Sequence, residues 1–386
     1  MLPASIELIV RALRVDAEVS SWRPADFDED DLAVTAIVVG LAPLLHWRLE
    51  SWGVSLAPRA QAKLAASRRA ALEREAAIGS QLAEALDALA VSGLTPIVLK
   101  GAYLAGAAYP APGLRLMNDI DLLFRPRDLP AAERVLADLG YGARSRAPEA
   151  GARVTKHTST FRRAGEDSAT PNPYLSQAAG CTIEPHRSLE ESWYGLRVDI
   201  TPGVWDRGRE SAIADRPART LSPEDTLLHV AVHLVFHLIM GYPALVQLMD
   251  MRFVIERWAG DLDWQRFHEL ASGAGAAPFV YAALRLARET LAAPVPLPTL
   301  NALAAACPSA LRARAARLSL ADVLRRTQRP PVVTLHQRLT HGLAERAEVA
   351  RWAPTLAAKW QVWRTALDVP RTDTGRLIAQ RIGLRA

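Results

Sequence analysis

The sequence predicts an α+β protein, with a mixed sheet core flanked by N-terminal helices and an all-helical C-terminal region. Three observations lead to this fold class. The stretch 60–90 is rich in alanine and almost free of glycine and proline, which favours one long helix. Residues 95–186 alternate short apolar runs with helical patterns, as a mixed sheet does. From Ser222 onward the pattern is helical, and Ser222 is placed to cap the first helix.

These patterns divide the chain into three regions: helical residues 1–90, a sheet core at 91–205 and a helical region at 206–386. In the core, the sequence predicts strands at 95–101, 119–124, 154–162 and 181–186, and helices at 102–108 and 128–139. Asp128 and Gly140 would begin and end the second helix. The segment 164–180 is rich in Gly, Pro, Ser and Asn, so we expect a loop or flap there.

Composition excludes several classes of protein. Half of the residues are apolar and 23% are charged, which is typical of a folded domain. Cys181 and Cys307 are far apart, which argues against a disulfide framework or a cysteine zinc site. The first residues show no signal-peptide pattern, and the apolar runs fall short of the about 20 residues that a membrane span needs. We therefore expect a cytoplasmic protein with no transmembrane segment.

Charge is distributed unevenly along the chain. Residues 311–386 contain 15 Arg or Lys against 5 Asp or Glu, although the whole chain carries only +5. A basic region of this kind can attract RNA, a phosphate-rich substrate or a membrane surface. It can equally be the solvated face of a helical domain, and no aromatic residues interleave with the arginines as in an RNA-binding module.

Asp119 and Asp121 carry the clearest chemical signal. Because side chains alternate across a strand, these two point to one face while Ile120 and Leu122 point to the other. Paired carboxylates repel each other unless a cation lies between them, and Mg²⁺ is usually held by one or two carboxylates plus substrate phosphates. The pair alone is also compatible with a solvent-facing edge strand.

Neighbouring residues make this pair more informative. Lys100 and Gly101 join a strand to a helix, where free backbone N–H groups attract phosphate. Arg115 lies just before the aspartates and could bind phosphate oxygens. Glu184, on a later strand, could be a third carboxylate. An anion cradle, a metal pair and a third acid are the parts of a phosphoryl-transfer site.

The run from Val98 to Tyr141 resembles the uncharacterised nucleotidyltransferase family of the DNA-polymerase-β-like superfamily. The matching pieces are Leu99-Lys-Gly101, Tyr109-Pro, Arg115, Asp119-Ile-Asp121-Leu-Leu and Leu139-Gly-Tyr141, with weaker matches at Lys156-His157, Ile183-Glu184-Pro-His186, His233, His237, Asp250 and Trp264.

The resemblance implies a nucleotidyltransferase-type core and a nucleoside triphosphate (NTP) such as ATP as substrate. It implies that Asp119, Asp121 and Glu184 are catalytic and bind metal, with two Mg²⁺ ions expected. Lys100, Gly101 and Arg115 would bind the nucleotide. One departure is that Ala102 follows Gly101, where many members of the superfamily have serine, so a hydroxyl contact to phosphate is missing. Lys100 could compensate, or the protein could bind nucleotide without turning it over.

Several histidines remain as candidates for contacts with the acceptor or with phosphate: His157, His186, His233 and His237. His229, His233 and His237 recur every four residues, so they line one stripe of a helix. The helix is apolar on its other sides, which also fits a structural role in a buried helix; zinc binding is a further alternative.

The acceptor is not readable from the residues. The resemblance suggests a ribosomally made, modified peptide of the lasso type, while the basic C-terminus suggests a tRNA end; a small molecule is a third candidate. The alternatives to such an enzyme are a non-catalytic nucleotide-binding scaffold or sensor, and a toxin-like tRNA nucleotidyltransferase.

Overall fold

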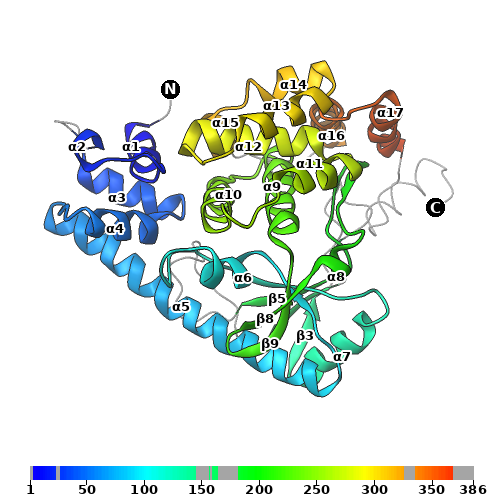
Figure 1. The fold of residues 1–386 in the computed structure, drawn as a ribbon, viewed down its shortest axis with the longest axis horizontal. Coiled ribbons are helices and arrows are strands. Elements are labelled where there is room, and N and C mark those ends of the chain that lie inside the picture. The colour runs from blue at the N-terminus through cyan, green and yellow to red at the C-terminus, as the bar shows by residue number, and fades with distance from the viewer. Residues whose placement is uncertain are drawn as a thin grey trace.

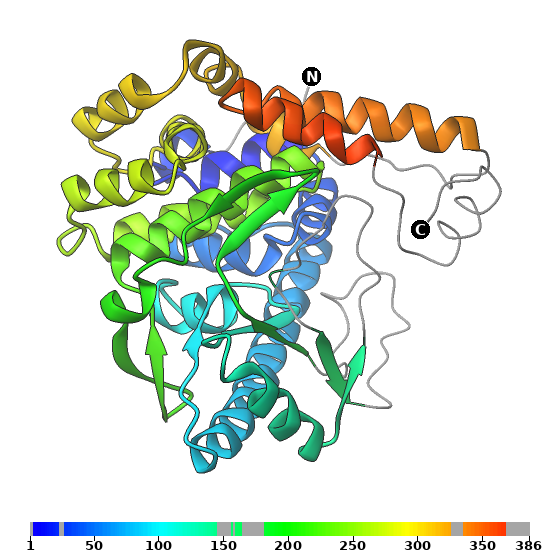
Figure 2. The same ribbon diagram turned by 90° about the vertical axis from the view of Figure 1, so that its right-hand side faces the viewer.

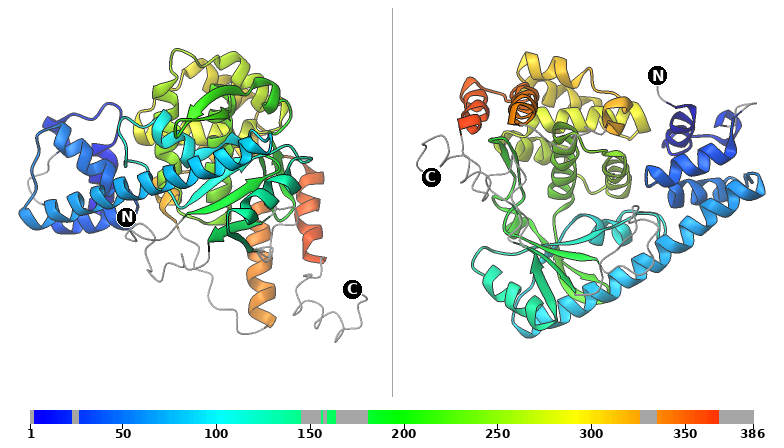
Figure 3. Two further views of the ribbon diagram at one scale, coloured as in Figure 1. Left: turned by 90° about the horizontal axis from the view of Figure 1, so that it is seen from below. Right: turned by 180° about the vertical axis from the view of Figure 1, so that it is seen from behind.

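The computed structural model describes residues 3–22, 27–144, 156, 159–163, 181–325 and 335–367. It confirms the predicted fold class, because a mixed sheet lies between helices at both ends of the chain (Figure 1). The N-terminal helices are α1 (Ala4–Ala12), α2 (Val19–Trp22), α3 (Glu29–Val38), α4 (Ala42–Ser51) and α5 (Pro58–Val91). The long helix predicted at 60–90 is α5, which runs from the other N-terminal helices along one side of the sheet (Figure 3).

The main sheet has seven strands in the order β3-β4-β5-β2-β1-β9-β8. β2 and β5 are parallel neighbours, and so are β1 and β9; the other pairs are antiparallel. The strands are β1 (Ile97–Val98), β2 (Asp119–Leu123), β3 (Tyr141–Arg144), β4 (Thr160–Arg163), β5 (Thr182–His186), β8 (Arg209–Ile213) and β9 (Arg216–Thr220). The core helices are α6 (Lys100–Ala107), α7 (Leu129–Asp138) and the short α8 (Val204–Arg207). The predicted flap at 164–180 and part of the predicted strand 154–162 lie outside the described residues.

The two faces of β2 belong to two different environments. Ile120 and Leu122 lie in an apolar cluster with residues of α5 and α7. Asp121 points to the opposite face, as strand alternation requires, and Leu123 on that face belongs to the cluster that includes α9. The acidic face of the sheet is therefore turned away from α5 and toward the C-terminal helices.

The sheet extends beyond the limit expected from the sequence. β8 and β9 continue the sheet past the expected core boundary at 205, as far as Thr220. A separate hairpin, β6 (Glu190–Trp193) and β7 (Leu196–Asp199), was also not predicted. Both hairpins turn through two residues with positive φ, which usually means Asn-Gly or Asp-Gly. Here the turns are Tyr194-Gly195 and Ala214-Asp215, so the sequence lacks the usual signal.

Helix α9 (Pro223–Met240) begins the C-terminal region, and the Ser222 hydroxyl accepts a hydrogen bond from the Asp225 N–H at 3.1 Å, as predicted. The β6–β7 hairpin lies between α9 and α17 (Figure 2). The remaining helices are α10 (Leu245–Arg257), α11 (Trp264–Gly273), α12 (Ala277–Leu291), α13 (Leu297–Ala306), α14 (Ser309–Ala315), α15 (Leu320–Leu324), α16 (Leu335–Ala350) and α17 (Leu356–Arg364). Among the described helices, none has the length and hydropathy needed to cross a membrane.

Candidate active site

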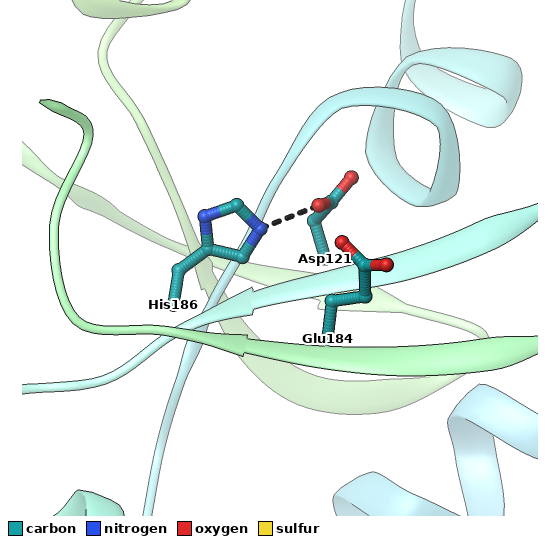
Figure 4. Close-up of side chains that lie close together, drawn as sticks. All are labelled: Asp121, Glu184 and His186. Atoms are coloured by element: carbon teal, nitrogen blue, oxygen red, sulfur yellow. Dashed lines mark hydrogen bonds and ion pairs between the residues drawn. The ribbon is translucent and has the colours of Figure 1, made fainter. Parts of the chain in front are cut away.

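The register of β2 against β5 brings three of the predicted residues together. In this parallel pair Asp121 lies opposite Glu184, and Leu123 lies opposite His186. Glu184 and His186 are two residues apart, so both share the face of Asp121. Figure 4 shows the three side chains converging from the two strands. One ligand atom from each lies within 4.8 Å of the others, which is close enough for a shared metal ion.

All three of these side chains are buried. Asp121 is 1% exposed, Glu184 3% and His186 0%. Burying two carboxylates side by side is costly unless positive charge or hydrogen-bond donors compensate. Asp119 lies on the same strand face at the partly exposed start of β2, opposite Thr182, and is not a member of the group of three. The structure therefore gathers Asp121 and Glu184 as expected, adds His186 and leaves Asp119 at the rim.

Lys100 and His186 both donate to Asp121. The Lys100 ammonium lies 3.0 Å from Asp121 Oδ1, and His186 Nε2 lies 2.5 Å from the same atom. Burial opposes the charge on Lys100, but Asp121, then Asp119, Glu191 and Glu184, outweigh it and raise the lysine pKa. The neighbouring acids thus hold Lys100 in its charged form.

Arg115 and Gly101 are positioned by each other. Arg115 Nε and Nη2 donate to the two carboxylate oxygens of Asp250, each at 2.8 Å, and the Tyr109 hydroxyl donates to the same carboxylate at 2.7 Å. A Cβ atom on Gly101 would lie 2.2 Å from Arg115 Nη1. Glycine is therefore needed where the guanidinium crosses the start of α6. Two of the three guanidinium nitrogens are bound to Asp250, and a direct phosphate contact by Arg115 stays a prediction.

A second polar cluster surrounds Glu191. Glu191, on β6, is 4% exposed and forms an ion pair with Lys156. His233 Nδ1 on α9 lies 2.8 Å from the same carboxylate oxygen of Glu191. Because a carboxylate can only accept, Nδ1 carries the proton and Nε2 is the ring atom left to accept one. The negative charge of Glu191 also helps to raise the pKa of Lys100, so the two clusters interact electrostatically.

The histidine stripe of α9 lines this second cluster. The His233 ring centroid lies 4.4 Å from that of His237 and 6.2 Å from that of His229. Burial lowers the pKa of His229 to about 3 and that of His237 to about 4, and it also lowers the pKa of His233 well below its usual value. The rings are therefore neutral near pH 7. Among the described residues, the only group with metal-binding spacing is Asp121, Glu184 and His186, so the zinc alternative for the stripe gains no support. His157 lies outside the described residues.

Sequence reasoning missed Glu191 and the pairing of Arg115 with Asp250. Glu190 and Glu191 look alike in the sequence, yet Glu190 pairs with the half-exposed Arg197 while Glu191 meets Lys156. Only the β6–β7 hairpin distinguishes them, and its Tyr194-Gly195 turn lacks the Asn-Gly or Asp-Gly signal that would have revealed it. The pairing with Asp250 joins residues 135 positions apart in the chain, so no local pattern indicates it.

Comparisons with known proteins identify the family of this chain. No curated protein matches the chain. The solved structure titled "Solution Structure of Antibiotic-Resistance Factor ANT(2'')-Ia Reveals Substrate-Regulated Conformation Dynamics" has a TM-score of 0.34 and 15% identity, over 54% of this chain and 94% of that one. This similarity is too low to support an argument about activity. Residues 25–292, more than half of the chain, match the model of the family described as uncharacterised nucleotidyltransferase, and the chain therefore belongs to that family.

Proposed function

We propose that this nucleotidyltransferase moves a nucleoside monophosphate from an NTP to a hydroxyl or phosphate of its acceptor at the site around Asp121. The acceptor oxygen bonds to the α-phosphorus, the bond from that phosphorus to the bridging oxygen breaks, and pyrophosphate leaves. The observation that supports this most is the register of β2 with β5, which buries Asp121 beside Glu184. The match to the family agrees with the reaction class.

The donor atoms fit a divalent cation. Two buried carboxylates lie close together, with the Lys100 ammonium 3.0 Å from Asp121, and carboxylate oxygens are the ligands that a hard divalent cation takes. Asp121 and Glu184 would hold it, and Asp119 at the rim would serve a second ion, with Mg²⁺ as the expected metal. When bound, such ions polarise the phosphoryl oxygens and neutralise their charge.

The protein's own residues have three tasks in this proposal. Lys100, at the start of α6, would bind the triphosphate. Gly101 keeps the start of that helix open for Arg115, which holds the loop against Asp250. This arrangement supports a positioning role for Arg115 in nucleotide binding.

The acceptor would lie against the cluster of Glu191 and His233. His233 Nε2 would receive the proton of an acceptor hydroxyl, and the hydrogen bond from Nδ1 to Glu191, which orients the ring, supports this role. His237 and Lys156 would contact the rest of the acceptor. The chemical class of the acceptor, whether modified peptide, RNA or small molecule, is an outcome of the experiment below.

The test uses the full chain with each of four NTPs labelled at the α-phosphate, and with RNA, peptide and small-molecule fractions as acceptors. We expect one fraction to take up label and pyrophosphate to appear in equal amount, both lost in Asp121→Asn. Label in tRNA would select a tRNA nucleotidyltransferase. Metal-dependent NTP binding with no pyrophosphate from any fraction would favour the non-catalytic scaffold and contradict the proposal.

A further inference from the structure

We propose that His186 is a direct ligand of the catalytic metal, so that the site is a mixed nitrogen and oxygen site that prefers Mn²⁺ to Mg²⁺. This inference rests on the proposed function, because it concerns the metal of the same site. It replaces the all-carboxylate set expected from the sequence, in which His186 was only a possible contact of acceptor or phosphate.

The geometry places His186 inside the site. Its Nε2 lies 2.5 Å from Asp121 Oδ1, on the side where the Glu184 carboxylate also converges (Figure 4). The group with mutual ligand distances within 4.8 Å consists of Asp121, Glu184 and His186, with Asp119 outside it. Among the described residues, the imidazole is thus the third possible ligand beside the carboxylates of Asp121 and Glu184.

The hydrogen bond between His186 and Asp121 shows where a metal would enter. Asp121 can only accept, so Nε2 carries the proton in this structure. A cation held by both side chains would displace the proton from between them, and the ring would stay neutral with its proton on Nδ1. The Lys100 ammonium, now 3.0 Å from Asp121, already supplies the positive charge that the carboxylate requires, and a bound metal would release it toward the triphosphate.

Two properties of the site favour Mn²⁺. Imidazole nitrogen is a ligand that transition metals accept more readily than Mg²⁺ does, and Mn²⁺ also accepts carboxylate oxygen. Mg²⁺ usually keeps several waters, whereas the three side chains here are at most 3% exposed. The imidazole nitrogen and the burial of the three side chains therefore both disfavour Mg²⁺.

The test measures binding of the metal ion to the full chain, first without nucleotide and then with a non-hydrolysable NTP analogue. Mn²⁺ binding to the full chain is followed by electron paramagnetic resonance, Mg²⁺ by competition, and nitrogen coordination by electron spin echo modulation. We expect Mn²⁺ to bind at least tenfold more tightly than Mg²⁺ and to show coupling to an imidazole nitrogen. His186→Gln should remove the coupling and reduce the preference, whereas His268→Gln on α11 should change neither.

Other outcomes contradict the inference. Absence of nitrogen coupling in the wild-type protein, with or without the analogue, would show that His186 only orients Asp121. Retention of the Mn²⁺ preference in His186→Gln would show the same. If that variant does not fold, wild-type protein made with ¹⁵N-histidine shows whether the coupled nitrogen belongs to a histidine. The His186→Asn variant then shows whether that histidine is His186. If nucleotide transfer persists without nitrogen coupling, only this inference fails; if transfer is absent with every metal, the proposed function fails.

Discussion

Lys100 combines an unusual backbone with a buried charge. Its φ is +42°, in the left-handed region that residues other than glycine seldom occupy. The ammonium is the partner of Asp121 at 3.0 Å, so the strain at this residue directs the charge into the site. An uncharged side chain at this position would keep the strained backbone and lose the charge.

Replacement of Lys100 by methionine tests its role in nucleotide binding. We expect Lys100→Met to weaken NTP binding by roughly tenfold to a hundredfold, about 1.4–2.7 kcal/mol, because the triphosphate loses a point charge. Isothermal titration calorimetry with the NTP and metal gives the dissociation constant. Lys156→Met is the matched control, since Lys156 pairs with Glu191 in the acceptor cluster. Equal losses in both variants would mean that Lys100 acts only through the overall charge of the site.

His229 should make the folded protein sensitive to acid. Its pKa is lowered to about 3 by burial first, then by Lys100 and Lys156, with Glu191 opposing and His186 adding to the shift. A histidine with a folded pKa below its unfolded value binds protons mainly in the unfolded chain. Its contribution is therefore present above about pH 6.5 and is lost as the pH falls toward 3.

We expect this residue alone to cost about 2 kcal/mol of unfolding free energy between pH 7.5 and pH 5. Urea unfolding of the wild type and of His229→Leu at these two pH values measures the difference. The leucine variant should lose about 2 kcal/mol less than the wild type over this interval. Identical pH dependence would indicate that His229 titrates normally in the folded protein.

The sequence alone predicts the part of the site that lies on regular strands. Asp121 and Glu184 follow from strand alternation, because each sits in a short apolar run whose other face is buried. The inclusion of His186 depends on the pairing register of two strands separated by more than 50 residues, which no local pattern encodes. Glu191 depends on a hairpin whose turn lacks the usual residues.

At the scale of elements, one buried carboxylate ties the core to the C-terminal helices. Asp250 on α10 accepts from Tyr109 and twice from Arg115, both of which belong to the loop between α6 and β2. These hydrogen bonds hold the loop that precedes the acidic strand. Because Arg115 also passes close to Gly101, they hold the start of α6 as well. The sheet and the C-terminal helices are thus linked next to the site.

Removal of this charge should destabilise the fold more than it affects the chemistry. In Asp250→Asn the buried Arg115 guanidinium loses its only carboxylate among the described partners, which typically costs about 3–5 kcal/mol. Urea unfolding measures the loss, and the NTP dissociation constant measures the nucleotide site. Little change in stability together with a tenfold weaker NTP affinity would assign Arg115 to the triphosphate.

The predicted elements were most accurate where local signals are strong. The long helix α5, the Ser222 cap and the acidic strand all have such signals, and all are confirmed. β8 and β9 lie at one end of the sheet order, and β9 carries Pro217 in the sequence Arg216-Pro-Ala-Arg-Thr220, which does not read as a strand. They were missed because tertiary pairing, rather than propensity, makes them strands.

At the scale of the whole molecule, the basic C-terminal region is partly used for packing. The sequence predicts that this region, which includes Arg312, Arg314, Arg325 and Arg326, can attract an anionic partner; Arg326 lies outside the described residues. Arg314 pairs with Glu348 and lies over the Trp352 ring at 5.2 Å, so it joins α14 to α16. Arg312 is exposed, and Arg325 is exposed with only a 4.0 Å contact to Asp322.

This division predicts different effects for arginines that look alike in sequence. Reversal of charge in Arg312→Glu with Arg325→Glu should raise the KM for the labelled acceptor several-fold at low salt and leave the NTP dissociation constant unchanged. The effect should shrink at physiological ionic strength, where screening limits the reach of a charge to about 8 Å. Arg314→Glu should instead lower the melting temperature, since it places a second carboxylate beside Glu348. Kinetics at two salt concentrations and thermal unfolding of both variants test this. An unchanged acceptor KM in the double variant at both salt concentrations would leave the exposed arginines with a solvating role only.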